Sequence, residues 1–207
     1  MKKSNKLIFG YLGFLWVSLA LTLVVSFTLT PQFSFVDEVR SKKFQLSEEF
    51  SAVKIQNTSY LKIELSDSTY LEYISIHGGD VKPPKTDPIK NYRVSNDTLY
   101  IDQLQQGENG SFALHVKNLS QILVSDKSRV YLTDLTLDSL SFESPDHELR
   151  LASLDSGTID YRSGQLFLKG SIGELTGRLK DQAWLNIPSK IGKLDIDKSE
   201  SASIWVD

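Results

Sequence analysis

Two Ser-x-x-Lys pairs, Ser51 with Lys54 and Ser59 with Lys62, could in principle supply a serine nucleophile with a basic partner. In enzymes that use this motif, one turn of helix places the lysine beside the serine. Here both pairs lie in segments where apolar and polar residues alternate, as in β-strands, and residues three apart on a strand point to opposite faces. We therefore predict that these residues are exposed polar groups on strands with no catalytic role.

The three histidines, His77, His115 and His147, are the first candidates for binding a metal ion. They lie far apart in the sequence and lack the close spacing of zinc-binding motifs. The chain has no cysteine, which excludes thiolate metal sites, a cysteine nucleophile and disulfide bonds. We expect three unrelated histidines, no metal site and no cofactor.

Two pairs of acidic residues, Asp134 with Asp138 and Asp195 with Asp197, could bind calcium or act on glycosidic bonds. An enzyme built on stacked coils would place its acids one above another. The coil length inferred below is about 19 residues, and 19 residues after Asp138 the chain has Gly157. Turns favour aspartate for local reasons. We therefore expect these acids to be solvated turn residues, and we predict no catalytic residue.

Three aromatic residues, Phe167, Trp184 and Trp205, are the best candidates for a binding surface, with Tyr161 as a further member. Trp184 precedes an apolar residue of the inward-facing series, and Trp205 lies between two such residues. Both tryptophans should therefore point outward from their strands. Exposed apolar patches often mark interaction sites, so these residues could stack on a carbohydrate.

Composition limits the classes of protein to consider. The 207 residues are 24% charged and 40% hydrophobic, with a net charge of −3, which fits one folded domain plus an appendage. An acidic chain lacks the basic surface that nucleic acids require, so we expect no nucleic-acid partner.

The appendage is an apolar segment near the N-terminus. Leu7–Thr30 contains 24 residues without a charge, which is long enough to span a bilayer, and three lysines precede it at positions 2, 3 and 6. The positive-inside rule then places residues 1–6 in the cytoplasm and the remainder outside. We predict a single-pass anchor in the cytoplasmic membrane with a periplasmic or extracytoplasmic domain. A cleaved signal peptide is the alternative.

A linker over residues 31–49 is expected to follow the anchor, because Pro31 ends the helix and the next residues are mixed in polarity. A short helix over Val36–Leu46 is compatible with the spacing of its apolar residues. From residue 50 to residue 207, apolar and polar residues alternate in short runs, which predicts an all-β domain. The segment His77–Pro88 is rich in proline and glycine, so we expect an exposed excursion there.

The second half of the domain contains an internal repeat. Apolar positions recur at steps of 17–19 residues, and a step of 19 leads from Leu166 to Leu185 and on to Ile204. The same step relates the apolar residues 130, 132, 135, 140 and 142 to residues 149, 151, 154, 159 and 161. Such a register is typical of a β-solenoid, in which each coil buries its apolar side against the next. We predict a right-handed β-helix, with Gly173 and Gly192 at the same strained corner of successive coils.

The order of these features resembles a family of bacterial envelope proteins named "putative auto-transporter adhesin, head GIN domain". The resemblance rests on residues 50–55 (FSAVKI), 61–65 (LKIEL) and 92–101 (YRVSNDTLYI), followed by short leucine-rich coils, and it covers residues 48–207. It implies an exported β-helical domain and transfers no catalytic residue. An uncleaved anchor departs from the commoner pattern of the family.

The function expected from these observations is that of a membrane-anchored, non-catalytic interaction or scaffold module, adhesin-like in character, whose partner is an envelope protein or a glycan. Two alternatives are a polymer-forming solenoid similar to bactofilins and a carbohydrate-active β-helix enzyme. The last coil ends at Asp207 without a polar cap, so we also expect it to dock on a partner or on a second copy of the chain.

Overall fold

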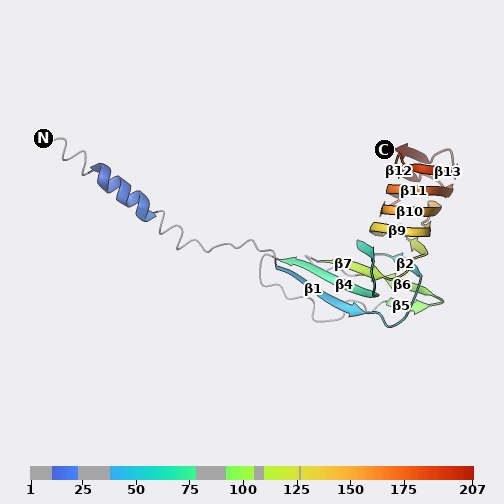
Figure 1. Cartoon of the computed structure of the whole chain (residues 1–207), viewed down its shortest axis with the longest axis horizontal. Coiled ribbons are helices and arrows are strands. Elements are labelled where there is room, and N and C mark those ends of the chain that lie inside the picture. Colours follow the sequence, from blue (N-terminus) through green and yellow to red (C-terminus); the bar gives the residue numbers. More distant parts are fainter. Residues whose placement is uncertain (1–10, 23–37, 78–91, 105–109, 126) are drawn as a thin grey trace. The chain divides into compact units, whose positions relative to one another are not determined.

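The computed structural model describes residues 11–22, 38–77, 92–104, 110–125 and 127–207 (Figure 1). The chain divides into two compact units, Met1–Asp37 and Glu38–Asp207. In the first unit, residues 11–22 form a helix. Among the described residues, no helix combines the length and the apolar character needed to cross a membrane. Residues 7–10 and 23–30 of the predicted anchor, and most of the excursion His77–Pro88, lie outside the described residues.

The second unit is all-β, as predicted, and its described strands form one 14-stranded sheet. The strands are β1 (Glu38–Gln45), β2 (Ala52–Gln56), β3 (Leu61–Leu65), β4 (Tyr70–His77), β5 (Tyr92–Ser95), β6 (Thr98–Asp102), β7 (Gly110–Val116), β8 (Gln121–Val124), β9 (Arg129–Glu143), β10 (His147–Arg162), β11 (Gln165–Leu179), β12 (Trp184–Ile187), β13 (Ile191–Lys198) and β14 (Ser203–Val206).

Strand β1 corrects the prediction for the segment before residue 50. The helix considered over Val36–Leu46 is wrong, because β1 pairs antiparallel with β4 along its whole length. Phe44 lies opposite Leu71 and packs against the core, and Leu46 is buried. Pairing with an existing strand edge therefore overrides the helix-like spacing of these apolar residues. The compact unit begins at Glu38, within the segment predicted as a linker.

The apolar residues that alternate with polar ones in the sequence form the buried core of β2 and β3. Val53, Ile55, Leu61 and Ile63 are all completely buried. They are brought together by pairings between distant segments. Strand β2 lies between β6 and β8, with parallel pairing on both sides, and β3 lies between β7 and β9 in the same way. The first strands of the domain are therefore inserted between strands that come later in the sequence.

The long strands β9, β10 and β11 follow one another in antiparallel order (Figure 1). The pairing implied by the 19-residue step is wrong here: Val130 lies opposite Tyr161, and Leu149 lies opposite Phe142. The apolar residues of β9 and β10 are separated by two positions at both ends of each strand, so the pattern fits either strand direction. The turns decide the direction. Ser163 and Gly164, both at positive φ, form the two-residue turn of a β-hairpin.

The 19-residue register is confirmed after β11. Gln165 lies beside Trp184, and Trp184 lies beside Ser203, in parallel strands. β13 pairs with the second half of β11 at the same step, with Ile172 beside Ile191. Residues at this step share a direction because directly paired residues of neighbouring strands point to the same face of a sheet.

Gly173 and Gly192 do lie at equivalent points of neighbouring strands, but neither has the strained conformation predicted for it. The glycines at positive φ in the described residues are Gly164, Gly170 and Gly177. A Cβ atom at Gly192 would lie 2.5 Å from the carbonyl oxygen of Gly173. Glycine is therefore required at position 192 by the close approach of the two backbones and not by a left-handed φ.

His147 is a core residue. Its side chain is completely buried and meets Phe142 and Tyr161 in edge-to-face contacts. Nδ1 lies 3.1 Å from Ser144 Oγ, and Nε2 lies 3.3 Å from the carbonyl oxygen of Trp184. Burial lowers the pKa of His147 below its ordinary value of 6.5, since the charged imidazolium loses its hydration.

The close backbone approach at Gly192 leads to a stability prediction. Gly192→Ala should lower the free energy of unfolding by about 1–3 kcal/mol, because the added methyl group collides with the neighbouring backbone. Urea denaturation of the full chain in mild detergent measures the change. Lys190→Ala, an exposed position two residues earlier, should leave the stability within about 0.5 kcal/mol of wild type. Equal stability of Gly192→Ala and wild type would contradict the close approach.

The buried His147 leads to a prediction about pH. The unfolded chain binds a proton at this residue more tightly than the folded chain, so its contribution is fully present above about pH 6.5 and is lost as the pH falls through and below this value. Urea midpoints measured between pH 8 and pH 5 should fall less steeply for His147→Gln than for wild type. Identical slopes for the two proteins would show that His147 does not resist protonation in the fold.

Candidate binding face

The outward side of β9, β10, β11, β12 and β14 carries two neighbouring rows of side chains. The first row consists of residues directly opposite one another on successive strands: Tyr131, Asp160, Phe167, Asn186 and Trp205. The second row is offset by two residues and consists of Arg129, Arg162, Gln165, Trp184 and Ser203. We call these two rows the binding face. Because paired strands lie about 4.8 Å apart, each row is a line of evenly spaced side chains.

The aromatic residues predicted from the sequence are brought together on this face. The rings of Phe167 and Trp184 meet edge to face, with their centroids 4.8 Å apart and an interplanar angle of 72°. Both side chains are half-buried, whereas Trp205 is 59% exposed. Trp205 lies one strand beyond Trp184 and two residues along it, a diagonal neighbour. The fourth candidate, Tyr161, is completely buried and belongs to the core.

The charged residues of the face are organised around one carboxylate. Asp160 is only 8% exposed, and both of its oxygens accept hydrogen bonds from Arg162 Nε at 3.0 Å, with a further bond from Arg162 Nη2. Arg129 Nε lies 3.8 Å from the same carboxylate. The hydrogen bond to Asp160 raises the pKa of the Arg162 guanidinium above its ordinary value, so this cation stays charged. Two-point contact with a carboxylate also fixes the plane of the guanidinium.

Fixing Arg162 places a planar cation beside the aromatic pair. Its guanidinium carbon lies 5.8 Å from the centroid of the Phe167 ring, within cation–π range. The second arginine near the carboxylate, Arg129, has its guanidinium carbon 5.3 Å from the centroid of the Tyr60 ring. The sequence analysis missed this arrangement, although Asp160 and Arg162 lie two residues apart on β10, a spacing that places both side chains on one face of a strand. Only the approach of Arg129, on β9, depends on pairing between strands. The face thus offers exposed aromatic surface next to oriented hydrogen-bond donors.

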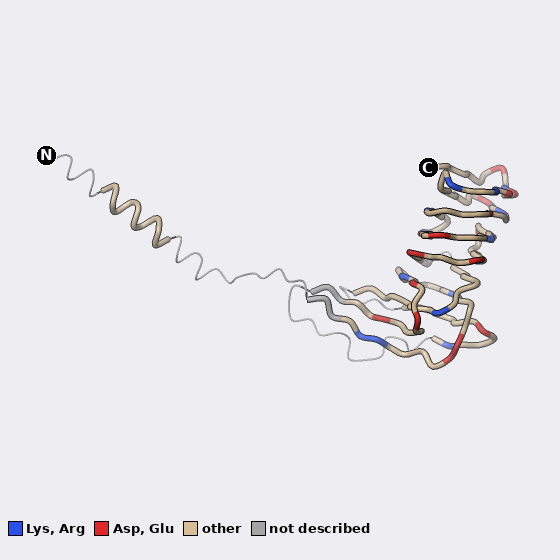
Figure 2. The backbone as a smooth tube through the Cα atoms, viewed as in Figure 1, with Lys and Arg blue, Asp and Glu red and all other residues tan. Residues whose placement is uncertain are grey.

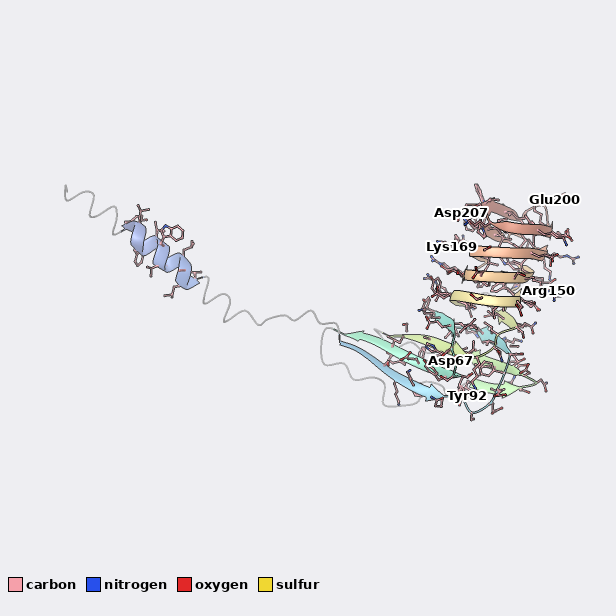
Figure 3. The ribbon with its side chains drawn as sticks, in the orientation of Figure 1. Asp67, Tyr92, Arg150, Lys169, Glu200 and Asp207 are labelled. Carbon is pink, nitrogen blue, oxygen red and sulfur yellow. The ribbon has the colours of Figure 1, made fainter. Side chains whose placement is uncertain are left out.

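Figure 2 shows basic and acidic residues interspersed along the strands of the second unit, and the stacked strands carry no extended block of either sign. In Figure 3 the side chains of β10 and β11 project outward from the ribbon, with Arg150 and Lys169 labelled.

The Ser-x-x-Lys pairs are not brought together. The Ser51 hydroxyl donates to the carboxylate of Asp97, and Lys54 Nζ lies over the ring of Tyr100 at 5.9 Å. Lys62 forms an ion pair with Glu64 on the same strand. Each lysine thus has a partner other than a serine, in keeping with strand geometry.

His115 has acidic neighbours that the sequence analysis did not anticipate. Its Nδ1 lies 3.6 Å from Glu64, and its Nε2 lies 3.3 Å from Glu72. The ring stacks on Tyr70 with a centroid distance of 4.3 Å. The pairing of β3, β4 and β7 brings these residues together, so only knowledge of strand order could have revealed the cluster. Across the described part of the chain, no group of three acidic or histidine side chains has a metal-binding arrangement.

The four acidic residues singled out in the sequence, Asp134, Asp138, Asp195 and Asp197, are all exposed. Asp134 adopts a positive φ, as expected for a residue at a turn or bulge. Asp197 forms an ion pair with Arg178 at 3.2 Å. Asp195 lies on the same exposed strand, β13, beside Thr176 of β11.

Comparison with known proteins gives likenesses of structure only. No family model matches the chain, and no curated protein matches it. Among solved structures, one described as "putative adhesin" from Bacteroides fragilis has 12% identity and a TM-score of 0.41, and the match covers 82% of this chain and 97% of that one. Another "putative adhesin", from Parabacteroides merdae, has 14% identity, a TM-score of 0.33 and coverage of 83% of this chain.

A third structure, described as "Putative lipid binding protein" from Parabacteroides distasonis, has 11% identity and a TM-score of 0.36, with 81% of this chain covered. The match spans 57% of the Parabacteroides merdae chain and 62% of the lipid-binding one, so this chain corresponds to little more than half the length of those proteins. None of the three is more than 14% identical to this chain.

Proposed function

We propose that this protein is an extracytoplasmic, non-catalytic binding module, adhesin-like in character, that uses the binding face to hold a glycan of the cell envelope. The observation that carries the proposal is the Phe167–Trp184 pair beside the oriented guanidinium of Arg162. Sugar rings combine apolar C–H faces with hydroxyl groups. Aromatic rings match the former, and planar donors such as guanidinium match the latter.

The placement of the domain outside the cytoplasm rests on the N-terminal segment. The described helix over residues 11–22 is apolar around its whole circumference, and its side chains are exposed, including Trp16 at 72%. An apolar surface of this kind favours a lipid environment over water. Together with the three preceding lysines, it supports a single-pass anchor over Leu7–Thr30 with its N-terminus in the cytoplasm.

We include a β-solenoid in the proposal, but over fewer residues than the sequence predicted. The repeated parallel step of 19 residues from β11 to β12 and on to β14 supports coils over residues 165–206. The antiparallel pairing of β9, β10 and β11 limits the coils to this part. Stacked coils suit a binding role, because the rows of the face continue from one coil to the next.

Substitution of the aromatic residues tests the proposal. Trp184→Ala and Trp205→Ala should each weaken binding to an envelope polysaccharide by about tenfold, since stacking contacts of this kind contribute about 0.5–1.5 kcal/mol beyond the area they bury. Affinity can be measured by glycan microarray and then by titration calorimetry of the full chain in detergent. Thermal denaturation of each variant checks that the fold persists.

Tyr100→Ala is the matched control. Like Phe167 of the binding face, Tyr100 has an arginine over its ring, with the guanidinium carbon of Arg93 4.7 Å from the ring centroid. Tyr100 lies on β6, outside the binding face. This variant should bind as wild type does. If wild type binds no glycan, or if folded Trp184→Ala and Trp205→Ala bind with unchanged affinity, the proposed function is wrong.

A further inference from the structure

β13 presents an unpaired strand edge. Among the described residues, β13 pairs with β11 alone, so its outer edge carries free backbone groups. Leu194 on this strand is 47% exposed, although the residue at the equivalent point one coil earlier, Leu175, is completely buried. An edge of this kind, with apolar side chains beside it, is a template for pairing with another strand.

The backbone direction of β13 from Lys193 to Lys198, where its pairing with β11 is continuous, follows from a hydrogen bond at its end. Ser199 N donates to the carbonyl oxygen of Leu179 on β11. Because N–H and C=O groups alternate in direction along a strand, Asp197 and Asp195 also direct theirs toward β11. Leu194 and Ile196 therefore direct their backbone groups toward the open edge.

The charges along β13 complement those of an identical strand that runs antiparallel to it. The strand reads Ile-Gly-Lys-Leu-Asp-Ile-Asp-Lys, so Lys193 and Asp195 flank Leu194 on the exposed side. Lys193 already forms an ion pair with Glu174 on β11 at 2.6 Å. No ion-pair partner within 4.0 Å of Asp195 is found in the described part of the chain, which leaves this carboxylate available toward the open edge.

We propose that two copies of the chain associate through this edge, as a two-fold dimer in which the β13 strands pair antiparallel with Leu194 opposite Leu194. This register satisfies the backbone directions, because Leu194 of each copy points its N–H and C=O at the other. It places Lys193 of each copy directly opposite Asp195 of the other, giving two ion pairs. It also covers the exposed Leu194 side chain of both copies.

Other two-fold registers with the same backbone directions are less favourable. Centring the pair on Asp195 places two aspartates face to face, and centring it on Lys193 does the same with two lysines. Centring it on Ile196 places Asp195 opposite Asp197, twice. Like charges directly opposite one another on paired strands are destabilising. Among the registers centred on residues 193 to 196, the charge pattern thus favours a second copy paired at Leu194.

Head-to-tail stacking into a filament is less compatible with the sheet. The edges at its opposite end are β1 and β5, which belong to antiparallel pairs with β4 and β6. A filament would have to join β13 to one of these unlike edges. A two-fold interface joins identical edges and closes on itself. The inference rests on β13, which contributes no residue to the binding face; among the described strands, β14, which carries Trp205, is likewise paired on one side only.

Cysteine crosslinking tests the register directly. The chain has no cysteine, so Leu194→Cys introduces a single thiol, which should form an intermolecular disulfide under mild oxidation of the full chain in detergent. Asp197→Cys is the matched control on the same strand. In the proposed register its two copies are about 20 Å apart, given a rise of about 3.4 Å per residue, and should not crosslink. Crosslinking of Asp197→Cys in preference to Leu194→Cys would overturn the register.

Charge reversal tests the interface itself. Lys193→Asp places like charges opposite each other twice, so it should raise the dimer dissociation constant by about tenfold or more in sedimentation velocity experiments. Adding Asp195→Lys to this variant should restore dimerisation, although the carboxylate introduced at position 193 still lies beside Glu174 in both variants. A monomeric wild type at all accessible concentrations, or a double variant no better than the single one, would overturn the proposal.

Discussion

The insertion of β2 and β3 between later strands is the constraint on which the rest of the sheet depends. Val53 lies between Leu99 and Ile122, and Leu61 lies between Phe112 and Val130. These buried residues join the hairpins at one end of the sheet to the long strands that follow. Without β3, the first residues of β9 would lose their neighbour on one side, and the stack that carries the binding face would begin on an open edge. The first strands of the domain are therefore needed to position residues much later in the chain.

The sequence could predict strands but not all of their directions. Alternation of apolar and polar residues identified the buried positions of β2, β3 and β6, since the side-chain period depends only on the local backbone. The 19-residue step predicted the parallel pairing after β11 correctly. It failed between β9 and β10, where the apolar spacing reads nearly the same in both directions. The turn residues Ser163 and Gly164 carried the missing information.

The residues of the binding face were likewise only partly predictable from the sequence. The outward direction of the tryptophans followed from their buried neighbours in the sequence. The Asp160–Arg162 pair could have been inferred in the same way, since the two residues lie two apart on β10, whereas the approach of Arg129 depends on the antiparallel register of β9 and β10. The same limit applies to His115, whose acidic neighbours come from strands on its two sides. Contacts between strands that pair in parallel at the 19-residue step can be predicted from periodicity, whereas contacts between other strands require knowledge of their order and direction.

The proposed glycan binding and the proposed dimer both depend on the stacking of strands, but they use different residues. Along β11, β12 and β14 it aligns outward side chains into rows, and at β13 it ends in an edge with free backbone groups. Pairing of two β13 edges would leave the residues of both binding faces unused, so each dimer would hold two faces. A polymer with repeated sugar units could then occupy both, and the second contact would form at a high effective concentration. Weak stacking on half-buried rings would in this way be sufficient for firm attachment to an envelope polymer.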